Sequence, residues 1–180
     1  GTARYDEIRP GCYDPKERIA DMDIDGVWGQ LCFPNYARFA GHRFYLDIDD
    51  PELALVCLKA YNDYLLEEWC GYAPDRLFGA AILPLNNIDE AVKEFERVAA
   101  MGATAIAFSE NPTVFGLPSV HTTHWDPILA IAQETGIPLC THIGSSSKLV
   151  TTSPDAPTTV LTIGMVSRLT STVLLGVMTV

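Results

Sequence analysis

The sequence predicts a parallel α/β fold. Four short apolar runs, each typical of a buried strand, alternate along the chain with segments in which apolar residues recur at helical spacing. No glycine-rich phosphate loop follows any of the four runs, which disfavours a dinucleotide-binding fold. The 180 residues are enough for one sizeable core, so we expect a single domain over residues 1–180.

The first strand is expected at residues 26–34, where an apolar run ends at a proline. Residues 18–25 read as the entry to this strand. The polar residues 1–17 carry Pro-Gly and Asp-Pro pairs, which indicate turns.

The first long helix is expected after an aromatic loop at residues 35–49. Asp50 is a suitable N-cap, and Pro51 then occupies the first helical position. The helix should continue to about Trp69. Its apolar and aromatic residues recur at helical spacing and are expected to pack into the core rather than to bind a ligand.

The second strand is expected at residues 77–85, and the four residues 86–89 then open an amphipathic helix. Gly102 ends this helix. The third strand follows at residues 103–109, with Glu110 at its carboxyl end.

The fourth strand is the one that we expect to carry chemistry. It follows a helix that begins at residues 124–127 and stops at Gly136, and it ends at His142 just before a Gly-Ser-rich loop. The last apolar stretch, 158–180, contains Arg168 and many hydroxyl side chains, so it is expected to be a buried helix and not a membrane span.

Composition restricts the partners that the chain can have. A net charge of -11 argues against binding to nucleic acid or to an anionic membrane, because both require a positive surface. Small molecules are the expected partners. The five cysteines form no Cys-x-x-Cys pair and are odd in number, which is typical of reduced thiols and predicts a cytoplasmic protein; no signal peptide opens the chain.

Four stretches of the sequence together resemble a known family. They are Met-Asp-Ile-Asp-Gly-Val at 22–27, Arg-Leu-Phe-Gly-Ala-Ala-Ile-Leu-Pro at 76–84, His-Trp-Asp-Pro at 124–127 and Pro-Leu-Cys-Thr-His-Ile-Gly at 138–144. In order and spacing they are similar to the amidohydrolase superfamily, in its amidohydrolase-related branch that includes the aminocarboxymuconate-semialdehyde decarboxylase-like enzymes.

This resemblance implies a TIM-type (β/α)₈ barrel. Such a barrel takes about 250 residues, so a chain with four strands should correspond to about strands two to five, as a fragment of the barrel. The family's first-strand His-x-His pair and its eighth-strand aspartate are absent from these residues. An unclosed sheet of this kind is expected to form homo-oligomers.

The resemblance also implies a divalent metal, with zinc as the expected ion and His142 as a ligand. In the intact enzyme such a metal would polarise a substrate carbonyl or carboxylate, or activate a bound water. The expected activity is that of a metal-dependent hydrolase or decarboxylase acting on a small carboxylated or aromatic-derived substrate. The choice among hydrolysis, decarboxylation and hydration stays open, and the catalytic acid is not assigned.

Four other residues are candidates for substrate binding. His42 and Arg43 lie in the aromatic loop, Glu110 follows the third strand, and His124 opens a helix; loops at strand ends commonly carry such groups. Two alternatives to a metal enzyme remain. The chain could be a truncated, non-catalytic binding or assembly segment, or Lys148 could serve a metal-free Schiff-base lyase.

Overall fold

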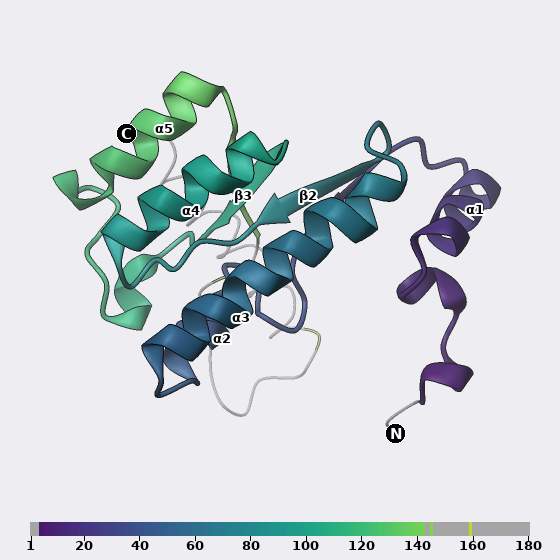
Figure 1. Ribbon diagram of the computed structural model, residues 1–180, viewed down its shortest axis with the longest axis horizontal. Helices are drawn as coiled ribbons and strands as arrows, with labels where there is room; N and C mark the ends of the chain where they lie inside the picture. Colours follow the sequence, from purple (N-terminus) through teal and green to yellow (C-terminus); the bar gives the residue numbers. More distant parts are fainter. Residues whose placement is uncertain (1–3, 143–144, 146–158, 160–180) are drawn as a thin grey trace.

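The computed structural model describes residues 4–142, 145 and 159. Its centre is a parallel four-stranded sheet in which neighbours in the chain are neighbours in space (Figure 1). The strands are β1 (Gln30–Cys32), β2 (Leu77–Ala81), β3 (Ala105–Phe108) and β4 (Leu139–Thr141). This order confirms the predicted α/β class and the part-barrel architecture.

Within the described residues, five α-helices and several shorter helical turns precede or connect these strands. The α-helices are α1 (Pro15–Asp25), α2 (His42–Leu46), α3 (Pro51–Asp63), α4 (Ile88–Ala100) and α5 (Asp126–Thr135). The shorter turns are η1 (Tyr5–Glu7), η2 (Pro10–Cys12), η3 (Tyr64–Trp69), η4 (Cys70–Tyr72), η5 (Pro112–Phe115) and η6 (Thr123–Trp125). Together, α3 and the π-helical turn η3 span the first long helix that the sequence predicts.

Side-chain caps explain where the helices begin. The carboxylate of Asp50 accepts hydrogen bonds from the backbone at the start of α3, and the side chain of Asn87 does the same for α4. The prediction was wrong for residues 15–25, which form α1 instead of turns and a strand entry. The reason is that Asp14 and Pro15 form an N-cap and first helical residue of the same kind as Asp50 and Pro51.

The strands are shorter or more exposed than predicted. β1 covers three residues of the predicted run 26–34, and β4 is half-buried instead of buried, because each lies at an edge of the described sheet. β2 ends at Ala81, earlier than predicted, because the backbone of Ile82 is hydrogen-bonded to the side chain of Asn62. The expected loop 35–49 also contains the short helix α2.

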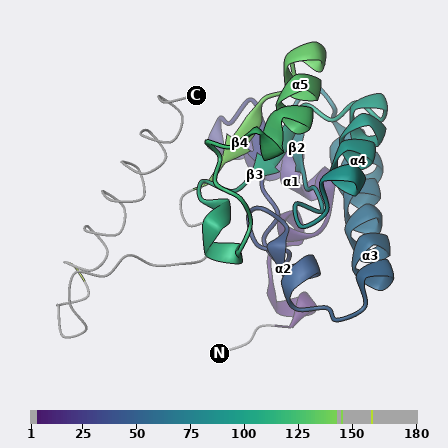
Figure 2. The ribbon, with the colours of Figure 1, turned by 90° about the vertical axis from the view of Figure 1, so that its left-hand side faces the viewer.

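The sheet has two distinct faces. Helices α3, α4 and α5 lie along one face, as Figure 2 shows, and α4 packs against α5. Apolar side chains between the sheet and α4 and α5 form the main core, which includes Phe95, Trp125, Ile106 and Ile128. Small residues, Ala80, Ala105 and Ala107, occupy the other face, where Phe33 and Cys140 pack against them.

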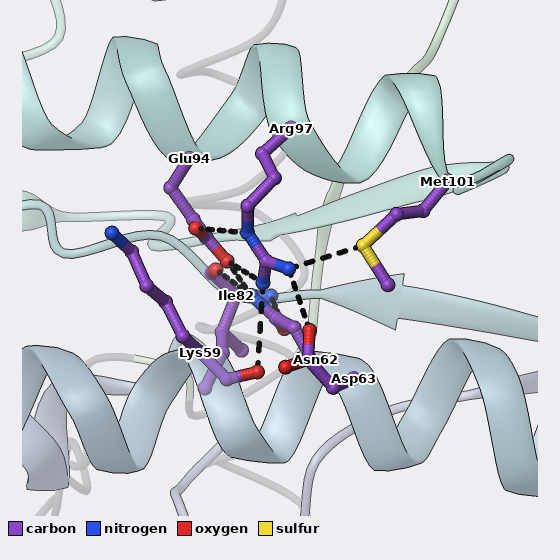
Figure 3. Close-up of polar contacts among 7 residues, drawn as sticks. All are labelled: Lys59, Asn62, Asp63, Ile82, Glu94, Arg97 and Met101. Atoms are coloured by element: carbon purple, nitrogen blue, oxygen red, sulfur yellow. Dashed lines mark hydrogen bonds and ion pairs between the residues drawn. The ribbon is translucent and has the colours of Figure 1, made fainter.

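A buried polar cluster fastens α3 and α4 to the end of β2 (Figure 3). The side-chain nitrogen of Asn62 donates to the Ile82 carbonyl (2.9 Å) and to Glu94 (2.7 Å), while its oxygen accepts from the Ile82 N–H (2.9 Å). Arg97 donates to both carboxylate oxygens of Glu94 (2.7 and 2.8 Å) and to Asp63 (2.6 Å). Asn62 and Glu94 are fully buried, so these hydrogen bonds replace the hydrogen bonds to water that both side chains lose on folding.

None of the helices in the described part of the chain has the length and hydropathy that a membrane span requires. The helix predicted at 158–180 lies outside the described residues, apart from residue 159.

The unpaired edges of the sheet lead to a prediction about association. Within the described residues, β1 and β4 each have a neighbouring strand on one side only, and Leu31 (40%) and Trp28 (73%) are exposed at the β1 edge. Unpaired strand edges and exposed apolar side chains promote association, so the isolated chain should form oligomers in light scattering.

A variant pair locates the surface responsible. Leu31→Lys should reduce the association because it places a charge on the open edge. Val56→Lys, on an exposed position of α3, should not, although it makes the same change in charge. A monodisperse wild-type monomer that unfolds cooperatively would contradict this account.

Candidate functional site

The carboxyl ends of the four strands lie at the same edge of the sheet, because all the strand pairs are parallel. Phe33 follows β1, Ser109 and Glu110 follow β3, and His142 follows β4. In a parallel β/α fold, this is the edge at which ligands and catalytic groups are placed. It is therefore the place to look for the predicted site.

His142 lies in an aromatic setting at the end of β4. Its ring stacks on Phe39, with centroids 3.8 Å apart and planes inclined by 20°, and meets Phe33 edge-on at 5.2 Å. These two phenylalanines come from the strand end and loop that follow β1. The contacts hold the imidazole in place from two directions and exclude water from part of its surface.

Ser145 connects Glu110 to His142. The Ser145 hydroxyl donates a short hydrogen bond to the Glu110 carboxylate and accepts one from the Glu110 backbone N–H at 3.2 Å. The Ser145 backbone N–H donates to the His142 carbonyl at 2.9 Å. Both Ser145 and Glu110 are buried, and their hydrogen bonds connect the end of β3 to His142 after β4.

His42 belongs to the same region. It is buried at the start of α2, and its ring stacks on Phe115, in the turn that follows Glu110, at 4.5 Å. Burial lowers the pKa of His42, and the positive charge of Arg38 lowers it further, while Asp47 and Glu110 act in the opposite direction. The imidazole is therefore neutral at pH 7, the form that can accept a proton or a hydrogen bond.

The structure thus connects His42, Glu110 and His142 to one cluster, whereas the side chains of the other two candidates contact other partners. Arg43 donates to Asp47 (3.1 Å), and its guanidinium lies 4.6 Å above the Tyr36 ring. His124 meets the ring of Trp125 edge-on at 4.7 Å, beside the core under α4 and α5.

Sequence reasoning missed several members of the cluster. Phe33, Phe39 and Phe115 provide its aromatic walls, and Ser145 joins two strand ends. Arg38 has a left-handed backbone (φ 62°), a conformation that is strained for a residue with a side chain, and its charge acts on His42. Only the position of these residues after strand ends could have indicated their role.

A cavity of about 380 Å³ lies apart from this cluster, between α2, α3 and the loop before α4. None of the five predicted residues lines it. Its walls carry carboxylates, among them Asp49 and Glu52, but no imidazole. We therefore regard the strand-end cluster, and not this cavity, as the candidate active site.

The cluster fits a divalent metal only in part. Its imidazole and carboxylate side chains are of the types that bind zinc. Within the described residues, however, no group of three or more histidine, cysteine, aspartate or glutamate side chains converges as a metal site requires. His142 can thus be one ligand, and the others would have to come from outside the described part of the chain.

Gly41 positions His42 and permits a direct test of the local packing. A Cβ at Gly41 would lie 2.9 Å from the Cβ of buried Ile82, whereas a Cβ at Gly26 would meet nothing within 4 Å. Both glycines have nearly the same left-handed backbone (φ 71° and 70°). In Gly41→Ala, the steric clash should therefore lower the free energy of unfolding by about 1–3 kcal/mol more than Gly26→Ala does.

Denaturant unfolding of the two variants measures this difference directly, because the strain of the left-handed backbone is common to both. Equal destabilisation would mean that Gly41 and Ile82 do not pack as described.

Comparison with known proteins agrees with this architecture. The sequence pattern of the amidohydrolase family matches residues 7–171. The chain belongs to the amidohydrolase family.

Two further comparisons concern one sequence and one solved structure. The chain is 33% identical over 88 residues to the 2-amino-3-carboxymuconate-6-semialdehyde decarboxylase of Caenorhabditis elegans; the match covers 49% of this chain and 20% of the decarboxylase. Its fold is similar to that of a Staphylococcus aureus protein assigned to the amidohydrolases, with a TM-score of 0.58 and 19% identity, over 89% of this chain and 53% of that one. The chain thus spans about half the length of this solved structure, and its match spans a fifth of the decarboxylase.

Proposed function

We propose that this chain forms part of a metal-dependent hydrolase or decarboxylase that acts on a small carboxylated or aromatic-derived substrate. The observation that carries the proposal is the position of His142, which stands at the carboxyl end of β4 beside the buried Glu110 and is held by two phenylalanine rings. Family membership and the resemblance to a decarboxylase support it.

In this proposal His142 binds a divalent metal, for which zinc is the first candidate. The remaining ligands come from outside the described residues, so we derive no reaction step through the metal. Affinity requires several converging ligands, and the isolated chain should consequently bind zinc weakly.

The other cluster residues suit the binding of a flat, negatively charged substrate. The rings of Phe33, Phe39 and Phe115 offer apolar walls, and the positive charge of Arg38 attracts a carboxylate. Neutral His42 can accept a hydrogen bond or a proton from the substrate. Arg43 and His124 remain proposed substrate contacts. Either side chain would contact the substrate only if the substrate, or another part of the enzyme that binds it, extends to that side chain.

The protein is proposed to be cytoplasmic and to self-associate, without binding nucleic acid or membranes. Five cysteines without a disulfide in the described structure and a net charge of -11 support these points.

The experiment is an assay of metal-dependent turnover in a polypeptide that carries this chain together with the strands that complete the barrel. The semialdehyde named in the relative is the first substrate to assay, with release of carbon dioxide as the readout. Chelation should abolish turnover, and added zinc should restore it. Full turnover after complete metal removal would overturn the proposal.

A non-catalytic assembly segment is the second candidate. It is favoured by the lack of a three-ligand metal group within the described residues. Under this alternative, the completed polypeptide would bind no metal and turn over no substrate. The lyase alternative depends on Lys148, which lies outside the described residues.

A further inference from the structure

Two cysteines meet on the helix-covered side of β1, away from the strand-end cluster. Cys32 is the last residue of β1, and Cys70 begins the turn η4. Cys32 packs against a small core that contains Cys70, Leu65 and Leu77 and is bordered by α1.

The register of the sheet explains why the two sulfur atoms are neighbours. Cys32 on β1 is paired with Gly79 on β2, and paired residues of adjacent strands direct their side chains to the same face. A Cβ at Gly79 would lie 3.1 Å from the sulfur of Cys70, so this sulfur occupies the space that a side chain at 79 would need. The Cys32 side chain points to the same face and packs against the cluster that contains Cys70.

The groups around Cys32 favour its thiolate. The neighbouring side chains of Cys70 and Trp69 lower the pKa of Cys32, and the positive charge of Arg18 on α1 lowers it further. The Nε atom of Arg18 is buried and has no hydrogen-bond partner among the described residues, which leaves a cationic donor available to an anion at this place.

Tyr61, on α3, also faces the pair, and the negative charge of a thiolate raises its pKa in addition to the larger effect of burial. Burial opposes the thiolate of Cys32, but Cys70, Trp69 and Arg18 together prevail and lower the pKa of Cys32 to about 7. The neighbouring Cys32, together with burial, raises the pKa of Cys70, which therefore remains protonated.

We propose that Cys32 and Cys70 form a reactive dithiol site that reduces low-molecular-weight disulfides and closes an internal disulfide in doing so. Cys32 is half-buried and can be reached by a small reagent, while Cys70 is buried in the cluster against which Cys32 packs. The site is independent of the proposed hydrolase or decarboxylase activity, because neither cysteine belongs to the strand-end cluster.

The chemistry balances without any further reagent. The Cys32 thiolate attacks one sulfur of the small disulfide, which forms a mixed disulfide and releases one small thiolate. That thiolate takes the proton of Cys70, whose sulfur then attacks the sulfur of Cys32 and expels the second small thiolate. Two electrons pass from the two cysteines to the small disulfide, and one Cys32–Cys70 bond is formed.

The test uses the full chain and oxidised glutathione as the probe. Peptide mapping without reduction should identify a Cys32–Cys70 crosslink, and in Cys70→Ser it should instead find glutathione retained on Cys32. Cys57→Ser is the matched control, since it also removes one thiol, and should leave the crosslink unchanged.

A second measurement examines the thiolate itself. The rate at which iodoacetamide alkylates Cys32 should reach half its maximum near pH 7, and Arg18→Met should move this midpoint to higher pH. Failure of the crosslink to form in the wild-type chain overturns the proposal, as does an alkylation midpoint that is the same with and without Arg18.

Discussion

Replacing Asn62 with leucine should destabilise the fold by about 3–5 kcal/mol, because it leaves several buried polar groups without partners. The Asn62 side chain satisfies both the N–H and the carbonyl of Ile82 and also donates to the carboxylate of Glu94. Leucine has a similar volume, so the loss comes from the missing hydrogen bonds and not from a cavity. Urea unfolding followed by circular dichroism measures the effect.

An exposed ion pair on α4 provides the control. Lys93 and Glu90 are joined at 2.6 Å on the surface of the helix, and Lys93→Met should have little effect on stability because solvent screens such pairs. If Asn62→Leu were as stable as Lys93→Met, the cluster of Figure 3 would not hold α3 and α4 to the sheet as described.

The second large effect concerns His142 and rests on the proposed function. In a polypeptide that completes the barrel, His142→Ala should lose bound metal and turnover together. The loss in metal affinity should exceed the roughly 10–100-fold that removal of an outer-shell partner typically causes, because a direct ligand is removed. Elemental analysis of the purified protein, together with the activity assay, measures both quantities.

His42→Ala is the matched control, since it removes another imidazole from the same cluster. The His42→Ala protein should keep the metal, because in our account His42 contacts the substrate and is not a metal ligand. Its ring is stacked on Phe115. A His142→Ala protein with full metal content and full turnover would show that His142 is an ordinary core histidine and not a metal ligand.

The sequence was most informative where hydrophobic spacing and helix caps agreed. Helices begin after Asp50 and Asn87 and end at Gly136, as the sequence predicts. Each of the four predicted strands is present in the predicted parallel order. Strand lengths were less predictable. The end of β2, for instance, depends on a hydrogen bond from Asn62, a residue 20 positions away in the chain.

The candidate site was predictable in part for a related reason. His142 and Glu110 could be found because both directly follow apolar runs, and parallel strands bring their carboxyl ends together. Their connection through Ser145, and the stacking of Phe39 on His142, depend on contacts between separate loops. No local spacing encodes such contacts.

The cysteine pair illustrates the same limit. Spacing identifies no motif in Cys32 and Cys70, which are 38 residues apart in the sequence. They become neighbours only through the register of β1 on β2 and the lack of a side chain at Gly79.

The most direct test of the central claim, that residue 142 binds the metal, is the absorption spectrum of a cobalt-substituted His142→Cys protein in the completed barrel. Thiolate is itself a good ligand, so the variant can retain metal while its ligand changes. We predict a new thiolate-to-cobalt charge-transfer band in the near ultraviolet, which should be absent from the wild type and from His42→Cys. A cobalt-loaded His142→Cys protein with the spectrum of the wild type would contradict the account.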